Sequence, residues 1–313
     1  MSAIELPEVK MNLHTPKNPA TGRVVKSEIC SSRKGAGIVR HIEIDVSGTD
    51  LAGNIRPGQA FGVLAPGEDA KGKPHKVRLY SVASPSRGED GNGNVIATTV
   101  KRVVEEHWET HKLFQGVCSN YLCDLQVGDE VKVSGPNGKS FLIPKAVEDH
   151  DYMFFATGTG IAPFRAMLID LLESGTKSQV YLFMGTPYET DLLYDDVMRK
   201  YAEEYDNFHY ITAISRHNQR DDDLGPMYID ERLDTHKDEL LPILKSGRAM
   251  IYVCGIAGME LGITKRLAKM LDPSDLAQFM EVDAETLADV DNWTRKTLKK
   301  PIRLTHQLCF EVY

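Results

Sequence analysis

Cysteine is scarce in this sequence, with five residues at positions 30, 118, 123, 254 and 309 among 313. Their number is odd and no two of them form a CxxC pair, so the chain offers neither a disulfide framework nor the ligands of a zinc ribbon. Cys118 and Cys123 have the gap that opens a plant-type iron–sulfur motif, but Gln126 stands where that motif needs its third cysteine. We therefore expect a reduced protein with no bound metal.

Long apolar runs and an excess of basic residues are also missing. No stretch approaches the roughly 18 apolar residues of a membrane-spanning helix, and the N-terminus lacks a charged-then-apolar signal. The 37 basic and 45 acidic residues leave a net charge of -8, which is a poor basis for binding nucleic acid. The start at Met, with no transit peptide rich in Ser and Arg, favours a bacterial cytoplasm over the plastid stroma.

The length suggests about two domains. Residues 1–20 are polar and interrupted by proline, which predicts an extended arm. Short alternating or β-branched segments separated by Gly and Pro then predict an antiparallel β-barrel over residues 21–148. The segments expected to form its strands are 23–29, 38–46, 59–64, 77–83, 95–104 and 130–134.

The pattern changes near residue 150. Residues 152–156 form a continuous apolar run, followed by glycine and then by a helical pattern from Pro163. The same unit recurs at residues 180–184, 208–214 and 250–254. Four units of strand and helix predict a parallel sheet in an α/β domain over residues 149–313, with ligands at the carboxyl ends of its strands.

Arg78, Tyr80 and Ser81 form the first candidate site. Arg78 and Tyr80 project to one face of a predicted strand, where a guanidinium suits a pyrophosphate and a phenol ring can stack on a heterocycle. Composition alone favours a simpler interpretation, a half-buried strand with an arginine on its wet side.

Two further segments place small residues before a helix. The segment 116–122 offers a helix N-terminus that suits a phosphate, although an ordinary helix capped by Ser119 is the alternative. The segment 157–163 follows a buried strand and carries Gly158 and Gly160, but Pro163 takes the place of the third glycine of GxGxxG. We favour nucleotide binding over a plain glycine turn here.

The ends of the last two predicted parallel strands carry the remaining candidates. Ser215 and Arg216, with Tyr228 a loop away, can hold the 2′-phosphate that distinguishes NADP from NAD. A plain surface arginine is the alternative. Cys254 precedes Gly255 at the other strand end, and a buried free cysteine usually only packs.

Taken in order, these segments resemble the plant-type, plastidic class of ferredoxin–NADP⁺ reductases over essentially the whole chain. That resemblance implies a two-domain fold, with a Greek-key β-barrel that binds FAD followed by an α/β parallel-sheet domain that binds NADP(H). The motifs that carry it are Gly67–Asp69, Gly72–Lys76, Arg78–Ser81, Gly116–Asn120, Gly158–Arg165 and Glu311–Tyr313.

The resemblance also implies roles for individual residues. Catalysis would involve Ser81, Cys254, Glu311 and Tyr313, with hydride transfer between flavin N5 and nicotinamide C4 and with Glu311 as a possible proton relay for Ser81. FAD would be held by Arg78, Leu79, Tyr80, Ser81, Val117, Cys118, Ser119 and the terminal Tyr313. NADP(H) would be held by Lys101, Thr157, Gly158, Thr159, Gly160, Ser215, Arg216, Tyr228, Gly255 and Met259.

The implied reaction passes electrons between ferredoxin, or flavodoxin, and NADP(H). We expect a monomer that presents a basic rim to its acidic partner. An NADPH-oxidising reductase that supplies an oxygenase is the alternative, and a flavin-binding adaptor without turnover is a more distant one. The candidate rim residues are Lys71, Lys73, Lys76, Lys139, Lys299 and Lys300.

Two positions depart from the family pattern. Pro226 stands where the family usually has a basic residue near the 2′-phosphate, so the preference for NADPH over NADH should be reduced unless Arg220 or Arg232 substitutes for that residue. We expect NADPH to be preferred even so. The loop that usually offers a tyrosine to the FAD adenine contains His107 and Trp108 instead, either of which could stack there, although the adenine could also be less covered.

Overall fold

The computed structural model describes residues 4–313 and divides into two compact units. The barrel unit comprises Pro7–Leu142 and Ala162–Asp170. The α/β unit comprises Ile143–Ile161 and Leu171–Tyr313 together with the start of the chain up to Leu6. The limits that we expected from the sequence, at residues 20 and 148, stay predictions, and the first three residues of the expected arm lie outside the described residues.

Six antiparallel strands form the barrel unit, as the alternating segments predicted. They lie in the order β4-β3-β8-β1-β2-β5, and the two outermost strands of this order also interact. The N–H of Ala83, just past β4, donates to the Ala97 carbonyl at 2.8 Å, so the sheet closes on itself. The strands are β1 Ala20–Ile29, β2 Val39–Asp45, β3 Ala60–Leu64, β4 Arg78–Ser81, β5 Val95–Lys101 and β8 Glu130–Asn137.

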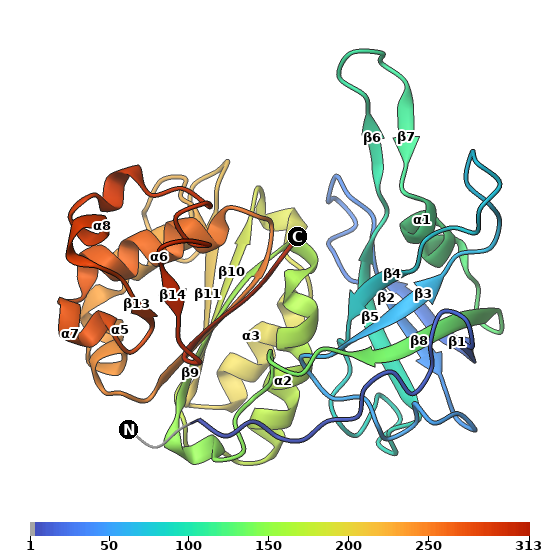
Figure 1. Ribbon diagram of the computed structural model, residues 1–313, viewed down its shortest axis with the longest axis horizontal. Helices are drawn as coiled ribbons and strands as arrows, with labels where there is room; N and C mark the ends of the chain where they lie inside the picture. The colour runs from blue at the N-terminus through green and yellow to red at the C-terminus, as the bar shows by residue number, and fades with distance from the viewer. Residues whose placement is uncertain (1–3) are drawn as a thin grey trace. The chain divides into compact units, whose positions relative to one another are not determined.

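An isolated hairpin extends from the barrel unit between β5 and the helix α1 (Val117–Asp124) (Figure 1). Its strands are β6 (Val104–Glu106) and β7 (Leu113–Gln115), which pair only with each other among the described strands. The sequence predicted a single strand over 95–104, but the structure ends β5 at Lys101 and starts the hairpin at Val104.

The α/β unit is built on a parallel sheet with helices on both sides (Figure 1). Its strand order is β11-β10-β9-β12-β15, and every residue of β10 and β12 is buried, which explains their continuous apolar sequence. The strands are β9 Asp151–Thr157, β10 Val180–Thr186, β11 Phe208–Ile214, β12 Ala249–Gly255 and β15 Leu308–Val312. A short antiparallel pair, β13 (Met280–Glu281) and β14 (Arg303–Leu304), lies outside this sheet.

Seven α-helices accompany these strands in the part of the chain that the structure describes beyond residue 142. They are α2 Ile161–Glu173, α3 Asp195–Glu204, α4 Arg232–Thr235, α5 Lys237–Lys245, α6 Met259–Met270, α7 Pro273–Leu276 and α8 Ala284–Ala288. The predicted fold class, an antiparallel barrel followed by a parallel α/β domain, is confirmed. None of the helices formed by residues 4–313 has the length and apolar character needed to cross a membrane.

Candidate functional site

Strand β4 presents the predicted FAD residues of the barrel unit. Arg78 pairs with Val63 and Tyr80 with Phe61, so the arginine and tyrosine share one face of the strand. Arg78 and Leu79 are exposed, whereas Tyr80 and Ser81 are half-buried. Burial, and next the neighbouring Cys118 thiol, raises the pKa of Tyr80 well above its usual value. The structure thus brings Tyr80 of β4 and Cys118 of α1 together.

Helix α1 leaves its N-terminus open. Gly116 is the N-cap residue and no side chain caps the helix, so the alternative of a helix capped by Ser119 is wrong. Ser119 lies in the first turn instead, where its hydroxyl donates to the Gly116 carbonyl at 3.1 Å. The first N–H groups of a helix have no partner within it, and the macrodipole is positive there. This geometry is suited to a phosphate group.

The ends of β9 and β12 meet where the strand order of the parallel sheet reverses. In open α/β sheets this switch point is where ligands bind. Thr157 ends β9, and its hydroxyl accepts the Ile256 N–H at 2.8 Å and contacts the Met259 sulfur at 3.3 Å. Thr157 and Met259, both predicted to bind NADP(H), are therefore in contact.

Two glycines make this close approach possible. A Cβ at Gly160 would lie 2.1 Å from the Cys254 carbonyl oxygen. At Gly255, where φ is 143°, a Cβ would lie 2.1 Å from the Thr157 hydroxyl. Both distances are far below contact distance, so only glycine fits at either position.

Strand β15, which the sequence did not predict, brings the C-terminus to the same place. Glu311 is paired with Cys254 across β12 and β15. The backbone of Tyr313 bonds to the end of β12 and to the loop after it: its N–H donates to the Gly255 carbonyl, and its carbonyl accepts from the Ala257 N–H, each at 3.0 Å. The Tyr313 hydroxyl lies 2.5 Å from that of Thr159, and the residue as a whole is 65% exposed.

Burial raises the pKa values of two neighbouring side chains, Glu311 and Cys254. It raises the pKa of the Glu311 carboxyl to about 7, which places its titration in the neutral range. Burial, and next the neighbouring Glu311 carboxylate, raises the pKa of the Cys254 thiol far above its usual value. Cys254 is therefore a neutral thiol at neutral pH and not a thiolate nucleophile, whereas Glu311 can hold or release a proton.

The candidate 2′-phosphate residues follow β11. Ser215 and Arg216 are anchored through their backbone N–H groups to the Thr186 and Pro187 carbonyls at 2.9 and 3.0 Å. The side chain of Arg216 is exposed, and that of Tyr228 is 70% exposed. These side chains are accessible to a ligand.

Neither Arg220 nor Arg232 presents a free guanidinium that could substitute for the family's basic residue. Arg232 is 2% exposed, and its guanidinium bonds to the Thr212 carbonyl, Asp222 and Gln219. Arg220 has a side chain 7% exposed and bonds to Asp195 at 2.7 Å and Asp221 at 3.0 Å. Both guanidiniums are committed to the protein, because the folded loop turns them inward.

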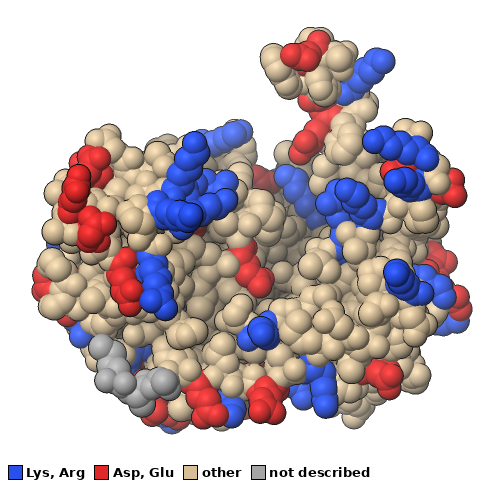
Figure 2. Space-filling model, in the orientation of Figure 1, with Lys and Arg blue, Asp and Glu red and all other residues tan. Residues whose placement is uncertain are grey.

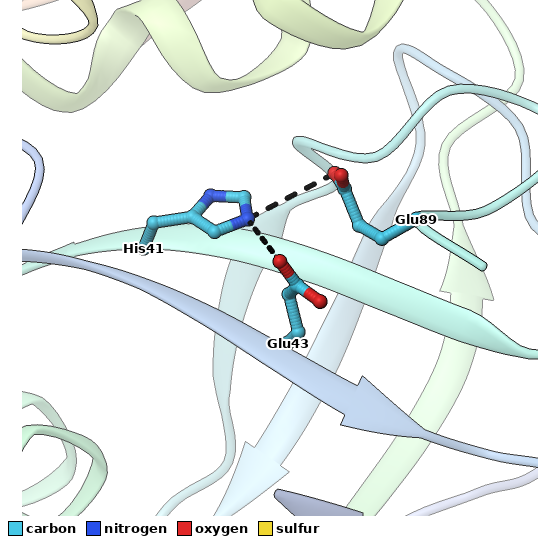
Figure 3. A group of neighbouring side chains, drawn as sticks. All are labelled: His41, Glu43 and Glu89. Carbon is cyan, nitrogen blue, oxygen red and sulfur yellow. Dashed lines mark ion pairs between the residues drawn. The ribbon is translucent and has the colours of Figure 1, made fainter. Parts of the chain in front are cut away.

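A group of charged side chains that the sequence did not single out lies in the barrel unit (Figure 3). His41 and Glu43 project from β2, and the His41 Nε2 atom lies 3.4 Å from Glu43 and 3.9 Å from Glu89. Among residues 4–313 this is the one group of His, Cys, Asp or Glu with spacing that suits a metal. Cations already neutralise its carboxylates, however: Arg165 bonds to Glu89 at 2.5 Å, and Lys26 lies 3.3 Å from Glu43. We interpret the group as a structural ion-pair network.

Basic side chains gather on parts of each unit's surface. Figure 2 shows Lys and Arg side chains close together on the α/β unit beside α6. The six lysines of the predicted rim are all exposed, with Lys71, Lys73, Lys76 and Lys139 on the barrel unit and Lys299 and Lys300 on the α/β unit. Lys101 is exposed at the end of β5 in the barrel unit.

The fold and the glycine-lined switch point define a class, the oxidoreductases that bind a nicotinamide dinucleotide on a parallel α/β sheet. The family model described as oxidoreductase NAD-binding domain accordingly matches residues 154–265. The chain is similar in fold to a solved ferredoxin–NADP⁺ reductase from Plasmodium falciparum, with a TM-score of 0.69 and 21% identity over 96% of this chain and 99% of that one.

Sequence comparison gives the family. The chain is 38% identical to a ferredoxin–NADP reductase from Spirulina sp over 83% of this chain and 90% of the relative. It is 37% identical to a root-type chloroplastic ferredoxin–NADP reductase from Nicotiana tabacum over 87% of this chain and 74% of the relative. This chain belongs to the ferredoxin–NADP reductase family.

Proposed function

We propose that the protein is a FAD-dependent reductase that passes electrons between ferredoxin, or flavodoxin, and NADP(H). The observation that carries this proposal is the pairing of β15 with β12. It places Glu311 beside Cys254 and bonds Tyr313 to the loop after β12 and to Thr159, at the switch point of a dinucleotide-binding sheet. A domain that only binds a nucleotide has no need of this arrangement.

FAD is held by the barrel unit. Arg78 neutralises its pyrophosphate, the open N-terminus of α1 takes up phosphate oxygens, and the Tyr80 ring stacks on the flavin. When bound, FAD supplies the conversion between single-electron steps and transfer of a hydride. The full set proposed for this group is Arg78, Leu79, Tyr80, Ser81, Val117, Cys118 and Ser119, with Tyr313 as a further aromatic contact.

NADP(H) is held mainly by the α/β unit. The Gly158–Gly160 turn allows the backbone to approach the pyrophosphate, while Ser215 and Arg216 bind the 2′-phosphate and Tyr228 stacks on the adenine. Thr157, Thr159, Gly255 and Met259 line the nicotinamide end. Lys101, exposed at the end of β5, is the remaining residue proposed to bind NADP(H).

Three residues serve the reacting centre of the α/β unit. Glu311, with a pKa near 7, holds a proton at its carboxyl oxygen, and the neutral Cys254 thiol positions the nicotinamide ring. Tyr313 is 65% exposed, and its ring can swing aside when its hydroxyl releases Thr159. Ser81 of β4 is the fourth catalytic residue of the proposal.

The partner binds through the basic rim, and the protein acts as a monomer in a bacterial cytoplasm. The exposure of all six rim lysines supports the proposal that the partner binds through the rim. An NADPH-oxidising reductase that supplies an oxygenase would use the same fold and residues. The two functions therefore differ only in the identity of the electron-transfer partner.

Cofactor preference tests the nucleotide half of the proposal. With Arg220 and Arg232 buried, Ser215 and Arg216 carry the 2′-phosphate contact, and we expect kcat/KM for ferricyanide reduction to be higher with NADPH than with NADH by at least tenfold. The Arg216→Ala variant should lose most of this preference, while Arg33→Ala, at an exposed position of the barrel unit, should retain it. Equal turnover with both nucleotides would contradict the assignment.

A further inference from the structure

The buried side-chain amide of Gln219 bridges the loop that follows β11. Gln219 is 7% exposed, and its Nε2 group donates to the carbonyls of Ile214 and Gly225 at 2.8 and 2.9 Å. Its Oε1 atom accepts the Ile214 N–H at 2.8 Å. The Gln219 side chain therefore connects the residue just before Ser215 to the far end of the loop.

A buried arginine holds this amide in turn. The Arg232 guanidinium donates to the Gln219 Oε1 atom at 3.1 Å and to the Thr212 carbonyl at 2.8 Å. Its third bond, at 2.6 Å, goes to Asp222. A guanidinium that is 2% exposed is stable only when its donors are satisfied, so these bonds stabilise each other.

The same loop contains three successive carboxylates, Asp221, Asp222 and Asp223. Such charges would repel a phosphate if they were free to approach it. Two of them are paired, since Asp222 bonds to Arg232 and Asp221 bonds to Arg220 at 3.0 Å. The closed loop thus leaves Arg216 as an accessible cation while neutralising carboxylates close to it in the sequence.

We propose that Gln219 and Arg232 are positioning residues that keep the acidic loop 217–226 closed and thereby allow Ser215 and Arg216 to recognise the 2′-phosphate of NADP(H). This inference rests on the proposed function and explains how the site retains a 2′-phosphate preference with Pro226 in place of a basic residue. Loss of these two side chains removes the bonds that they make across the loop and frees the Asp222 carboxylate.

The adenine contact depends on different bonds. The N–H of Met227 donates to the Ile214 carbonyl at 3.0 Å, and the N–H of Tyr228 donates to the Glu231 carboxylate at 2.6 Å. Neither bond involves the side chain of Gln219 or Arg232. Opening the loop should therefore weaken binding of the 2′-phosphate much more than binding of the adenine.

Calorimetric titration of the full-length holoenzyme with 2′-phospho-AMP and with AMP tests the proposal. For the Gln219→Leu variant we expect the ratio of the two Kd values to fall at least tenfold, with Kd for AMP changed less than twofold. The KM for NADPH should rise while kcat stays within twofold. The neighbouring Asn218→Ala variant, at an exposed position of the same loop, should match the unaltered protein.

A second variant distinguishes loss of the positioning role from a folding defect. Gln219→Glu keeps the oxygen that faces Arg232 and replaces only the donor to Ile214 and Gly225, so it should fold and still lower the ratio about threefold or more. An unchanged ratio in both variants, or an equal loss of both ligands, would overturn the positioning role. If the unaltered protein does not bind 2′-phospho-AMP more tightly than AMP, the proposed binding of NADP(H) is wrong. The positioning role of Gln219 and Arg232 is then wrong as well.

Discussion

At the scale of the residue, Glu311 shows how burial and function are coupled. Its pKa is raised to about 7 by burial, whereas an exposed glutamate titrates near 4.5. The folded state therefore holds the proton more tightly than the unfolded state, and the stability gained from the neutral carboxyl is present below about pH 4.5 and lost as pH rises through about 7.

The Glu311→Gln variant should lack this dependence. Because its side chain is neutral at every pH, the Tm of the variant minus that of the unaltered protein should become more positive by about 3–6 °C between about pH 5 and about pH 8.5. Differential scanning calorimetry without nucleotide measures this difference. Glu285→Gln, at an exposed position of α8, should show no such trend. A pH-independent difference for Glu311→Gln would contradict the raised pKa.

Residue types and the family resemblance supplied the candidate site residues from the sequence, but neither could say which of the side chains are buried. Arg216, Arg220 and Arg232 are equivalent cations in the sequence. Only the folded loop turns Arg220 and Arg232 inward onto carboxylates and leaves Arg216 accessible. The ion-pair network around His41 was missed because Glu89 and Arg165 lie far from His41 in the sequence, and only the fold brings them together.

At the scale of the element, alternation and continuous apolar runs predicted the barrel strands and the four parallel strands, because each pattern reports which faces are buried. Strand β15 escaped prediction because its five residues follow a basic, polar stretch and are only partly buried after Leu308. The β6–β7 hairpin escaped because all of its strand residues are exposed and show no period. Both missed elements carry candidate residues: Glu311 lies in β15, and His107 and Trp108 lie in the turn of the hairpin.

The hairpin also gives a test of FAD binding. Trp108 lies in its turn with 80% of its surface exposed, while His107 uses its Nδ1 atom to accept N–H groups of that turn at 3.3 Å. Of the two aromatic candidates, Trp108 is thus the freer to stack on the FAD adenine. Trp108→Ala should weaken FAD binding about 3- to 10-fold in fluorescence titrations, and Glu109→Ala should not. Unchanged FAD affinity in Trp108→Ala would rule the stacking out.

At the scale of the whole molecule, a net charge of -8 coexists with exposed lysines at the predicted rim. Ferredoxin-dependent turnover should therefore fall several-fold as ionic strength rises from about 0.05 to about 0.3 M, because screening weakens attraction between surface charges. NADPH-dependent reduction of ferricyanide should change little. Replacing Lys299 and Lys300 by Gln should flatten the salt response, and Lys237→Gln, an exposed control, should not. If ferredoxin-dependent turnover of the unaltered protein does not change with ionic strength, the proposal that the rim lysines bind the partner is wrong.

The central claim is electron transfer between NADP(H) and ferredoxin through FAD. Its most direct test is the reduction of cytochrome c by NADPH, with and without ferredoxin, on purified protein whose absorbance spectrum has first been recorded. We predict a flavin spectrum and a reduction rate that ferredoxin increases many-fold. A colourless protein, or a rate that ferredoxin leaves unchanged, would contradict the account.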